Sequence, residues 1–403
     1  MTDETYDPFF HLTADTEWNA CIGPQGNEFN YIDGYMEAAV LLATTLLREE
    51  MHVNRDTLAM PILYNARHAI ELLLKFVVSH LAQAKVLGHA PALNHDIAEY
   101  HQKLSDSHVG DRALRGFIAE LDPYVTSLAA IDSDGQELRY VKNRDGGGSL
   151  AGRPLVNLEL VKHSLDKLKV LLEAMRYRTI EFAEELGTKS HTPQCSRKDL
   201  LEIAKLLPPK TEWGTPEFST AKDNIKTLYG LISNRQCIAA LEIIKGNREM
   251  GGLIGLEFPL VYLTDEQVVQ IVEHWSLRHP ARANTSSGID FFSRSDREAM
   301  MQSLSRDATI NARLRELLNA EAIADLDAIF YTGRERLYSE WYETNVARAL
   351  REHDLERDDS NALEHLISKT NLFKCLVRGL TILGRRELAE NIRKLRPDLS
   401  CFE

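Results

Sequence analysis

Apolar side chains recur at spacings of three and four along most of the chain from residue 31 onward. No segment shows a convincing alternation of apolar and polar residues, the pattern typical of a half-buried strand. Residues 57–85 give the clearest helical example, because this segment is apolar on all sides between Ile70 and Leu81. A helix of that composition is surrounded by other elements. The sequence therefore predicts an all-α fold.

The same spacing predicts four further helices in the first half of the chain. They span residues 31–51, 95–104, 112–131 and 155–186. Asn94 is expected to cap the second of these, because a short amide side chain accepts hydrogen bonds from the free N–H groups of a first turn. Together with the central segment, these helices predict a bundle over residues 31–190.

Residues that interrupt helices mark the divisions in the rest of the chain. Residues 1–30 are acidic and irregular in pattern, and we expect them to form an N-terminal arm. Residues 191–222 hold several prolines and are expected to be a linker around one short helix, since proline interrupts helices. Residues 223–403 return to helical spacing, with Thr264 as an expected helix start. They predict a second, mainly helical domain, whose role the sequence does not indicate.

The composition of the chain limits where the protein can be located and which cofactors it can bind. The net charge of −13 argues against nucleic-acid binding through bulk charge alone, because such affinity depends on neutralising phosphates. The five cysteines lie far apart without CxxC spacing, which favours a reducing cytoplasm. No apolar run is long enough for a membrane span, and no secretory signal is visible. We find no nucleotide-binding loop or metal-ligand pattern, so we expect a cytoplasmic protein with no metal, no other cofactor and no membrane contact.

Four polar residues fall on one face of the apolar segment 57–85. Arg67, His68, Glu71 and Lys75 are spaced at three and four, so they can lie together on a helix. Charge on a buried helix must be paired, because an unpaired buried charge is costly. In one interpretation, Glu71 accepts a hydrogen bond from Arg139 or Tyr140 and fixes the loop that contains these two residues. In the other, His68, Glu71 and Arg139 line a cleft for a nucleotide or RNA.

Three phrases of the first half occur together: YNARHAIELLLKFVV at 64–78, NHDIAEYHQKL at 94–104, and DSDGQELRYVKNRDGG at 132–147. In order and spacing they resemble the HEPN superfamily (higher eukaryotes and prokaryotes nucleotide-binding). The resemblance covers residues 30–190. It implies a helical bundle and an effector that cleaves RNA without a metal or modifies nucleotides, in bacterial antiviral defence or a toxin–antitoxin system. It also implies a homodimer, because the family's sites are composite.

Active HEPN members carry Arg-x4–6-His near the start of the last helix, where the histidine moves a proton and the arginine holds the phosphate. Here Arg153 and His163 are separated by nine residues, so enzymatic activity stays an open question. The spacing does occur at Arg348 and His353, outside the resembling region. Our candidate catalytic residues are His68, Arg139, Arg348 and His353, and our candidate substrate-binding residues are Arg67, Glu71, Lys75, Tyr140 and Arg144.

The departure from the family motif supports an alternative of a different class. The chain would then be a non-catalytic helical scaffold or regulator that binds a partner protein, with the C-terminal domain as the contact surface.

Overall fold

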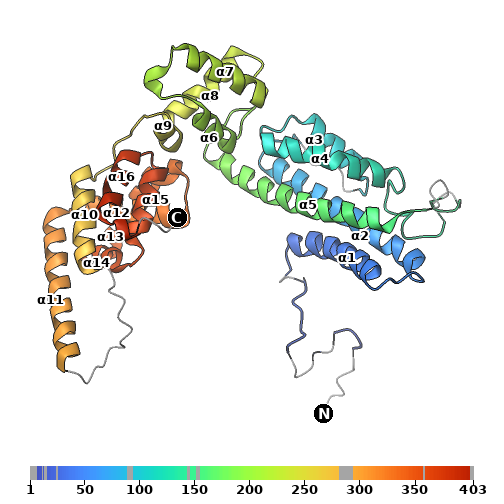
Figure 1. The fold of residues 1–403 in the computed structure, drawn as a ribbon, viewed down its shortest axis with the longest axis horizontal. Helices are drawn as coiled ribbons and strands as arrows, with labels where there is room; N and C mark the ends of the chain where they lie inside the picture. Colours follow the sequence, from blue (N-terminus) through green and yellow to red (C-terminus); the bar gives the residue numbers. More distant parts are fainter. Residues whose placement is uncertain are drawn as a thin grey trace. The chain divides into compact units, whose positions relative to one another are not determined.

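A computed structural model gives the fold of the chain (Figure 1). It describes residues 7–10, 12, 16–23, 26–88, 94–142, 146–150, 155–280, 294–356 and 359–399. This part of the chain contains helices, turns and one isolated bridge between Lys142 and Gly148, but no β-strand. The prediction of an all-α fold is confirmed.

The α-helices are α1 (Glu28–Arg48), α2 (Arg55–Gln83), α3 (Ile97–Asp106), α4 (Arg112–Ala129), α5 (Leu158–Gly187), α6 (Arg197–Leu206), α7 (Pro216–Tyr229), α8 (Asn234–Gly246), α9 (Arg248–Leu253), α10 (Asp265–Arg278), α11 (Arg294–Leu317), α12 (Ala320–Glu335), α13 (Tyr342–Glu356), α14 (Asp359–Ser368), α15 (Leu372–Ile382) and α16 (Arg386–Leu395). Short 3-10 helices are η2 (Lys210–Glu212), η3 (Ser339–Trp341) and η4 (Pro397–Leu399). Among the described residues, no helix combines the length and the apolar character needed to cross a bilayer.

The chain divides into two compact units, residues 1–183 and 184–403. The division falls inside α5, slightly before the expected end of the bundle at residue 190. The stretch 191–222, expected to be a linker around one short helix, contains α6 and the start of α7. Leu200 and Ile203 of α6 are fully buried in a hydrophobic core of the second unit. Helix α7 begins at Pro216 itself, because a missing N–H costs nothing in the first turn of a helix.

Helix α2 lies at the centre of the first unit, as its composition predicted. Its buried side chains include Ile62, Ile70, Leu73, Leu74 and Leu81, each completely shielded from solvent. Helix α1 packs along one side of α2 and α3 along another, and α4 packs on α3 (Figure 1).

Two arginines of α5 hold the other helices of this unit in place. Arg176 donates to Asp33 of α1 at 2.6 Å, and Arg178 donates to Asp111 at 2.7 Å. Asp111 is also the N-cap of α4, where it accepts from the backbone N–H of Leu114. One buried carboxylate therefore both starts α4 and fixes α4 against α5.

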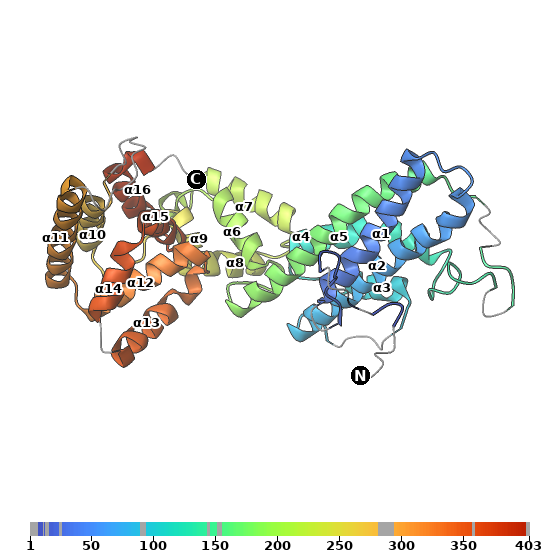
Figure 2. The ribbon, with the colours of Figure 1, turned by 90° about the horizontal axis from the view of Figure 1, so that it is seen from below.

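The second unit contains two hydrophobic cores. Helices α6 to α9 enclose the smaller one, and α10 to α16 enclose the larger. Helices α12 and α15 lie side by side in both views (Figures 1 and 2). They approach closely where Gly333 faces Gly379, because neither residue has a side chain to separate the backbones.

Candidate functional site

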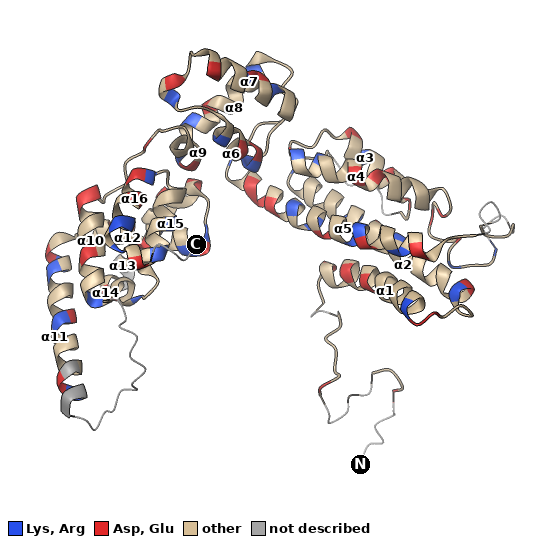
Figure 3. Cartoon of the chain, viewed as in Figure 1, with Lys and Arg blue, Asp and Glu red and all other residues tan. Residues whose placement is uncertain are grey.

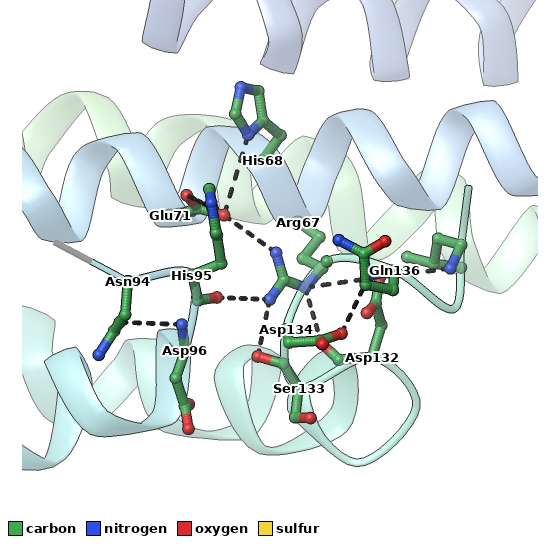
Figure 4. A network of polar contacts seen from close by, with 12 residues as sticks. Arg67, His68, Glu71, Asn94, His95, Asp96, Asp132, Ser133, Asp134 and Gln136 are labelled. Carbon is green, nitrogen blue, oxygen red and sulfur yellow. Dashed lines mark hydrogen bonds and ion pairs between the residues drawn. The ribbon is translucent and has the colours of Figure 1, made fainter. Parts of the chain in front are cut away.

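Arg67 joins three separate segments of the first unit (Figure 4). Its Nε donates to the carbonyl of Asp132 at 2.7 Å, and its Nη2 donates to the carbonyls of His95 at 2.7 Å and Ser133 at 2.9 Å. Its Nη1 donates to Oε2 of Glu71 at 3.1 Å. The side chain is buried, with 1% exposed. Arg67 therefore fastens the loop after α4 and the segment before α3 onto α2.

The loop at 132–138 is shaped to close over Arg67. Asp132 is fully buried and accepts from the backbone N–H groups of Glu137 and Leu138, which closes the turn. Gly135 has φ +78°, a conformation that favours glycine, and a Cβ there would lie 3.1 Å from Nη1 of Arg67. The glycine thus allows the loop backbone to approach the guanidinium directly.

Glu71 is the acceptor at the centre of the cluster. Besides Arg67, it accepts from Nζ of Lys75 at 2.6 Å and from Nδ1 of His95 at 2.8 Å. Burial alone would raise the pKa of Glu71, but the hydrogen bonds from Lys75 and His95 hold that pKa below its ordinary value. Glu71 is therefore an ionised carboxylate at neutral pH. We call Arg67, Glu71, Lys75, His95 and Asp132 the Arg67 cluster.

The expected hydrogen bond from the loop to Glu71 is replaced by a different one. The loop is held down, but Arg67 holds it through backbone carbonyls, whereas Glu71 bonds within α2 and to His95. Asn94 does not cap α3 either. Asp96 is the N-cap and accepts from the backbone N–H groups of Ala98 and Glu99. Asn94 instead accepts from the backbone N–H of Asp96, which fixes the preceding turn.

His68 lies between two tyrosines on the half-exposed side of the same helix. Tyr35 of α1 meets the His68 ring edge-on at 4.3 Å between centroids, and Tyr64 stacks on it at 5.7 Å with 7° between planes. Burial, and then the charges of Lys75 and Arg67, lower the pKa of His68 despite the opposing effect of Glu71. His68 is therefore neutral at pH 7.

Arg139 continues this row toward the loop. Its guanidinium lies over the ring of Tyr64 at 5.7 Å and over that of Tyr140 at 5.5 Å. Its Nε donates to the carbonyl of Gly135, while the Tyr140 side chain is largely exposed. We call Tyr35, His68, Tyr64, Arg139 and Tyr140 the aromatic row. It brings two of the predicted catalytic residues, His68 and Arg139, into one continuous surface.

Arg348 and His353 belong to the second unit and do not form a pair. They lie five residues apart on α13, so they point to different sides of the helix. The Arg348 side chain is 53% exposed and lies 3.9 Å from Glu352, whereas His353 is buried. The spacing therefore matched the HEPN motif without bringing the two groups together.

Two further residues complete the comparison with the sequence. Arg144 lies outside the residues that the structure describes. His95 was not among the candidates, although its segment was one of the three phrases that carried the resemblance. The only sequence feature that could have indicated His95 is its position two residues before the start of a helix. Its contact with Glu71, which lies 24 residues earlier, does not follow from the spacing of neighbouring residues.

No group of three or more metal-ligating side chains occurs among the described residues. A comparison of the chain with protein-family models, curated proteins and solved structures found no match.

Proposed function

We propose that this chain is a HEPN-like protein that acts on RNA, and that its first unit holds single-stranded RNA on the aromatic row. The observation that carries the proposal is the row itself, in which rings and a guanidinium follow one another from Tyr35 to Tyr140. The resemblance of residues 30–190 to HEPN sequences adds the biological setting, bacterial antiviral defence or a toxin–antitoxin system. It also adds a homodimer, and the scattered cysteines favour the reducing cytoplasm.

The chemistry of the row suits unpaired bases. Aromatic rings and arginine planes stack on bases of any sequence, and such stacking contributes about 1–3 kcal/mol per base. Within the described part of the chain, Nη1 and Nη2 of Arg139 form no hydrogen bond, so both can reach a phosphate. Arg67 differs, because its three nitrogens already donate to protein oxygens.

The charge pattern favours local recognition over bulk attraction. Acidic and basic residues are interspersed along the helices of both units (Figure 3), and the chain is net acidic. A general polyanion binder would need an excess of positive charge to neutralise phosphates. Stacking on a few rings, with Arg139 as the phosphate contact, does not need that excess.

A binding measurement tests the proposal. Fluorescence anisotropy with a short fluorescein-labelled, single-stranded, 2′-O-methyl RNA avoids cleavage during the experiment. We expect Arg139→Ala and Tyr140→Ala each to weaken binding by about tenfold, the loss of roughly one stacked contact. The control is Arg55→Ala, which removes the same charge from an exposed position at the start of α2. Equal affinities for the wild type and both row variants would contradict the proposal.

A specific observation favours the alternative of a non-catalytic scaffold or regulator. Arg67 and Glu71, two of the candidate substrate-binding residues, are 1% and 2% exposed and bond within the chain. If the folded wild type binds no RNA at low salt, these residues serve structure alone. The C-terminal domain would then be the surface to test with candidate partner proteins. Light scattering of the purified chain tests the homodimer separately.

A further inference from the structure

Glu71 and His95 form a carboxylate–histidine pair at the edge of the Arg67 cluster. The carboxylate is buried, with 3% of its side chain exposed, whereas the imidazole is 61% exposed. Their hydrogen bond, at 2.8 Å, uses Nδ1 of the ring. The rest of the imidazole is therefore free of the carboxylate, and its exposure leaves it accessible to a ligand. Figure 4 shows the two side chains next to each other.

The protonation of the pair follows from its partners. Glu71 accepts from Lys75 and Arg67 as well as from His95, so it is an ionised group that can only accept. Nδ1 of His95 must then carry the proton of the hydrogen bond. In the neutral ring this leaves Nε2 as an unprotonated nitrogen, which is the tautomer that a general base requires.

The pair is also held rigidly. Arg67 donates to the backbone carbonyl of His95, and Asp96 caps the helix that begins directly afterwards. Lys75 fixes the other side of the Glu71 carboxylate and lies over the ring of Tyr100 at 5.9 Å. A base whose partner and backbone are both fixed loses little freedom when it meets a substrate.

The pair lies next to the aromatic row. Nδ1 of His68, in the middle of the row, is 4.0 Å from Oε2 of Glu71, while Nδ1 of His95 is 2.8 Å from Oε1 of the same group. The two imidazoles thus flank one carboxylate. RNA stacked beside His68 would therefore lie next to the carboxylate that holds His95.

We propose that His95 is the catalytic base of an RNA-cleaving reaction in this chain, with Glu71 as its positioning residue. The inference rests on the proposed function. Nε2 of His95 takes the proton of a ribose 2′-OH, and O2′ forms a bond to the adjacent phosphorus as the bond from phosphorus to the 5′-oxygen breaks. The leaving oxygen takes a proton from solvent, and His95 returns its proton to solvent. The products are a 2′,3′-cyclic phosphate and a 5′-hydroxyl, and no metal or oxidant takes part.

This assignment moves the reactive histidine to the start of α3. The HEPN motif would place it on the last long helix, where His163 is an exposed residue of α5. His163→Gln is therefore a matched control for His95→Gln, because both remove an exposed imidazole from the first unit. Comparing the two variants distinguishes a reactive histidine on the last long helix, where the HEPN motif would place it, from one at the start of α3, which the geometry favours.

The experiment uses the full chain with EDTA present and a fluorescein-labelled single-stranded RNA as the probe. We expect His95→Gln to lower the cleavage rate by about 100-fold without changing affinity for the 2′-O-methyl RNA. We expect His163→Gln to cleave at the wild-type rate, and the all-deoxy version of the probe to stay intact. Imidazole added to His95→Gly should restore part of the rate. Glu71→Gln should lower kcat with KM unchanged, where kcat is calculated per active site from an active-site titration. A loss of folded protein alone would not lower a kcat obtained in this way.

The outcomes separate this inference from the proposed function. Cleavage by His95→Gln at the wild-type rate, or cleavage of the all-deoxy probe, would overturn the role of His95 and leave RNA binding intact. A wild type that binds the 2′-O-methyl RNA but does not cleave the probe would do the same. Absence of binding would overturn both.

Discussion

Arg67 shows how one side chain can order several segments at once. It links α2, the turn before α3 and the loop after α4 through four hydrogen bonds, three of them to backbone carbonyls. Backbone acceptors buried away from water cost free energy when they lose their donor. Arg67 therefore holds in place the segments that form both the aromatic row and the Glu71–His95 pair, although it is too buried to touch a ligand.

Replacing Arg67 should loosen this part of the first unit. Arg67→Met keeps most of the volume but leaves three carbonyls unpaired and removes a cation from Glu71, so we expect a loss of about 3 kcal/mol in the free energy of unfolding. Hydrogen exchange of peptides from residues 132–142 measures it. Arg55→Met is the control, because that side chain is 62% exposed. Unchanged exchange in Arg67→Met would refute the structural role.

Gly135 gives a test in which the control should change stability in the opposite direction. Gly135→Ala forces a side chain into a positive-φ conformation and against Arg67, so we expect a loss of about 1–2 kcal/mol. Gly116→Ala in the exposed interior of α4 meets no atom within 4 Å and should gain about 0.5–1 kcal/mol from helix propensity. Thermal unfolding followed by circular dichroism compares the two. A loss of stability in both variants would mean that the added methyl group destabilises the protein whatever the conformation of the backbone.

Asp327 in the second unit predicts a pH dependence of stability. Burial raises the pKa of Asp327 to about 6, against the opposing charge of His353. A folded-state pKa above the ordinary 3.8 means that the native state binds more protons, so this stabilisation is present at low pH and lost as pH rises through 6.

Asp327→Asn removes that loss. We expect the variant to exceed the wild type by about 1–2 kcal/mol at pH 7, with the difference disappearing toward pH ~4. Melting temperatures across this range, followed by tryptophan fluorescence, measure the difference. Glu335→Gln, on the same helix with a half-exposed carboxylate, should show no such trend. A constant difference between wild type and Asp327→Asn at all pH values would contradict the assignment.

At the scale of the elements, the sequence predicted helices well where their signals are local. The central segment 57–85 corresponds to α2 at Arg55–Gln83, and 155–186 corresponds to α5 at Leu158–Gly187. Thr264 caps α10 as expected, with Gln267 completing a capping box. Periodicity and caps depend on residues within a few positions of each other, which is why these features could be read directly.

The candidate site was predictable only in part, for the same reason. The shared face of Arg67, His68, Glu71 and Lys75 follows from helical spacing, and the structure places them together. The acceptors of Arg67 are carbonyls of the loop, and their positions depend on the path of the backbone, which no spacing rule gives. His95 reaches the site from the segment before α3 and Tyr35 reaches it from α1, so tertiary packing alone brings them there.

The crossing of α12 and α15 predicts a strong effect from a small change. A Cβ on Gly333 would overlap the carbonyl oxygen of Cys375, and one on Gly379 would overlap that of Ile329. Gly333→Ala must separate two helix backbones, so we expect a loss of about 3 kcal/mol in the second unit. Trp275, buried in the same core, reports the unfolding by fluorescence. Gly246→Ala, which meets no atom within 4 Å, is the control. Equal stabilities for the two variants would show that the helices can move apart freely.

For the whole molecule, the division into two units raises the question of whether they unfold independently. The larger and smaller cores of the second unit contain only residues after position 194. The first unit has its own buried helix, α2. Helix α5 runs through the division, so residues of both units belong to it, and a loss of stability in one unit could pass along it to the other.

The tryptophans make independence measurable. Trp213, Trp275 and Trp341 all lie in the second unit, and Trp18 of the first is 86% exposed, so a fluorescence transition reports the second unit. We expect Arg67→Met to accelerate hydrogen exchange in α2 while the fluorescence midpoint in denaturant stays within about 0.5 kcal/mol of the wild type, because the hydrogen-bond partners of Arg67 all belong to the first unit. A parallel shift of both signals would mean that α5 transmits the loss and that the chain unfolds as one body. In that case the pH effect of Asp327 should also appear in the exchange of α2, because a single cooperative transition carries every contribution to its stability.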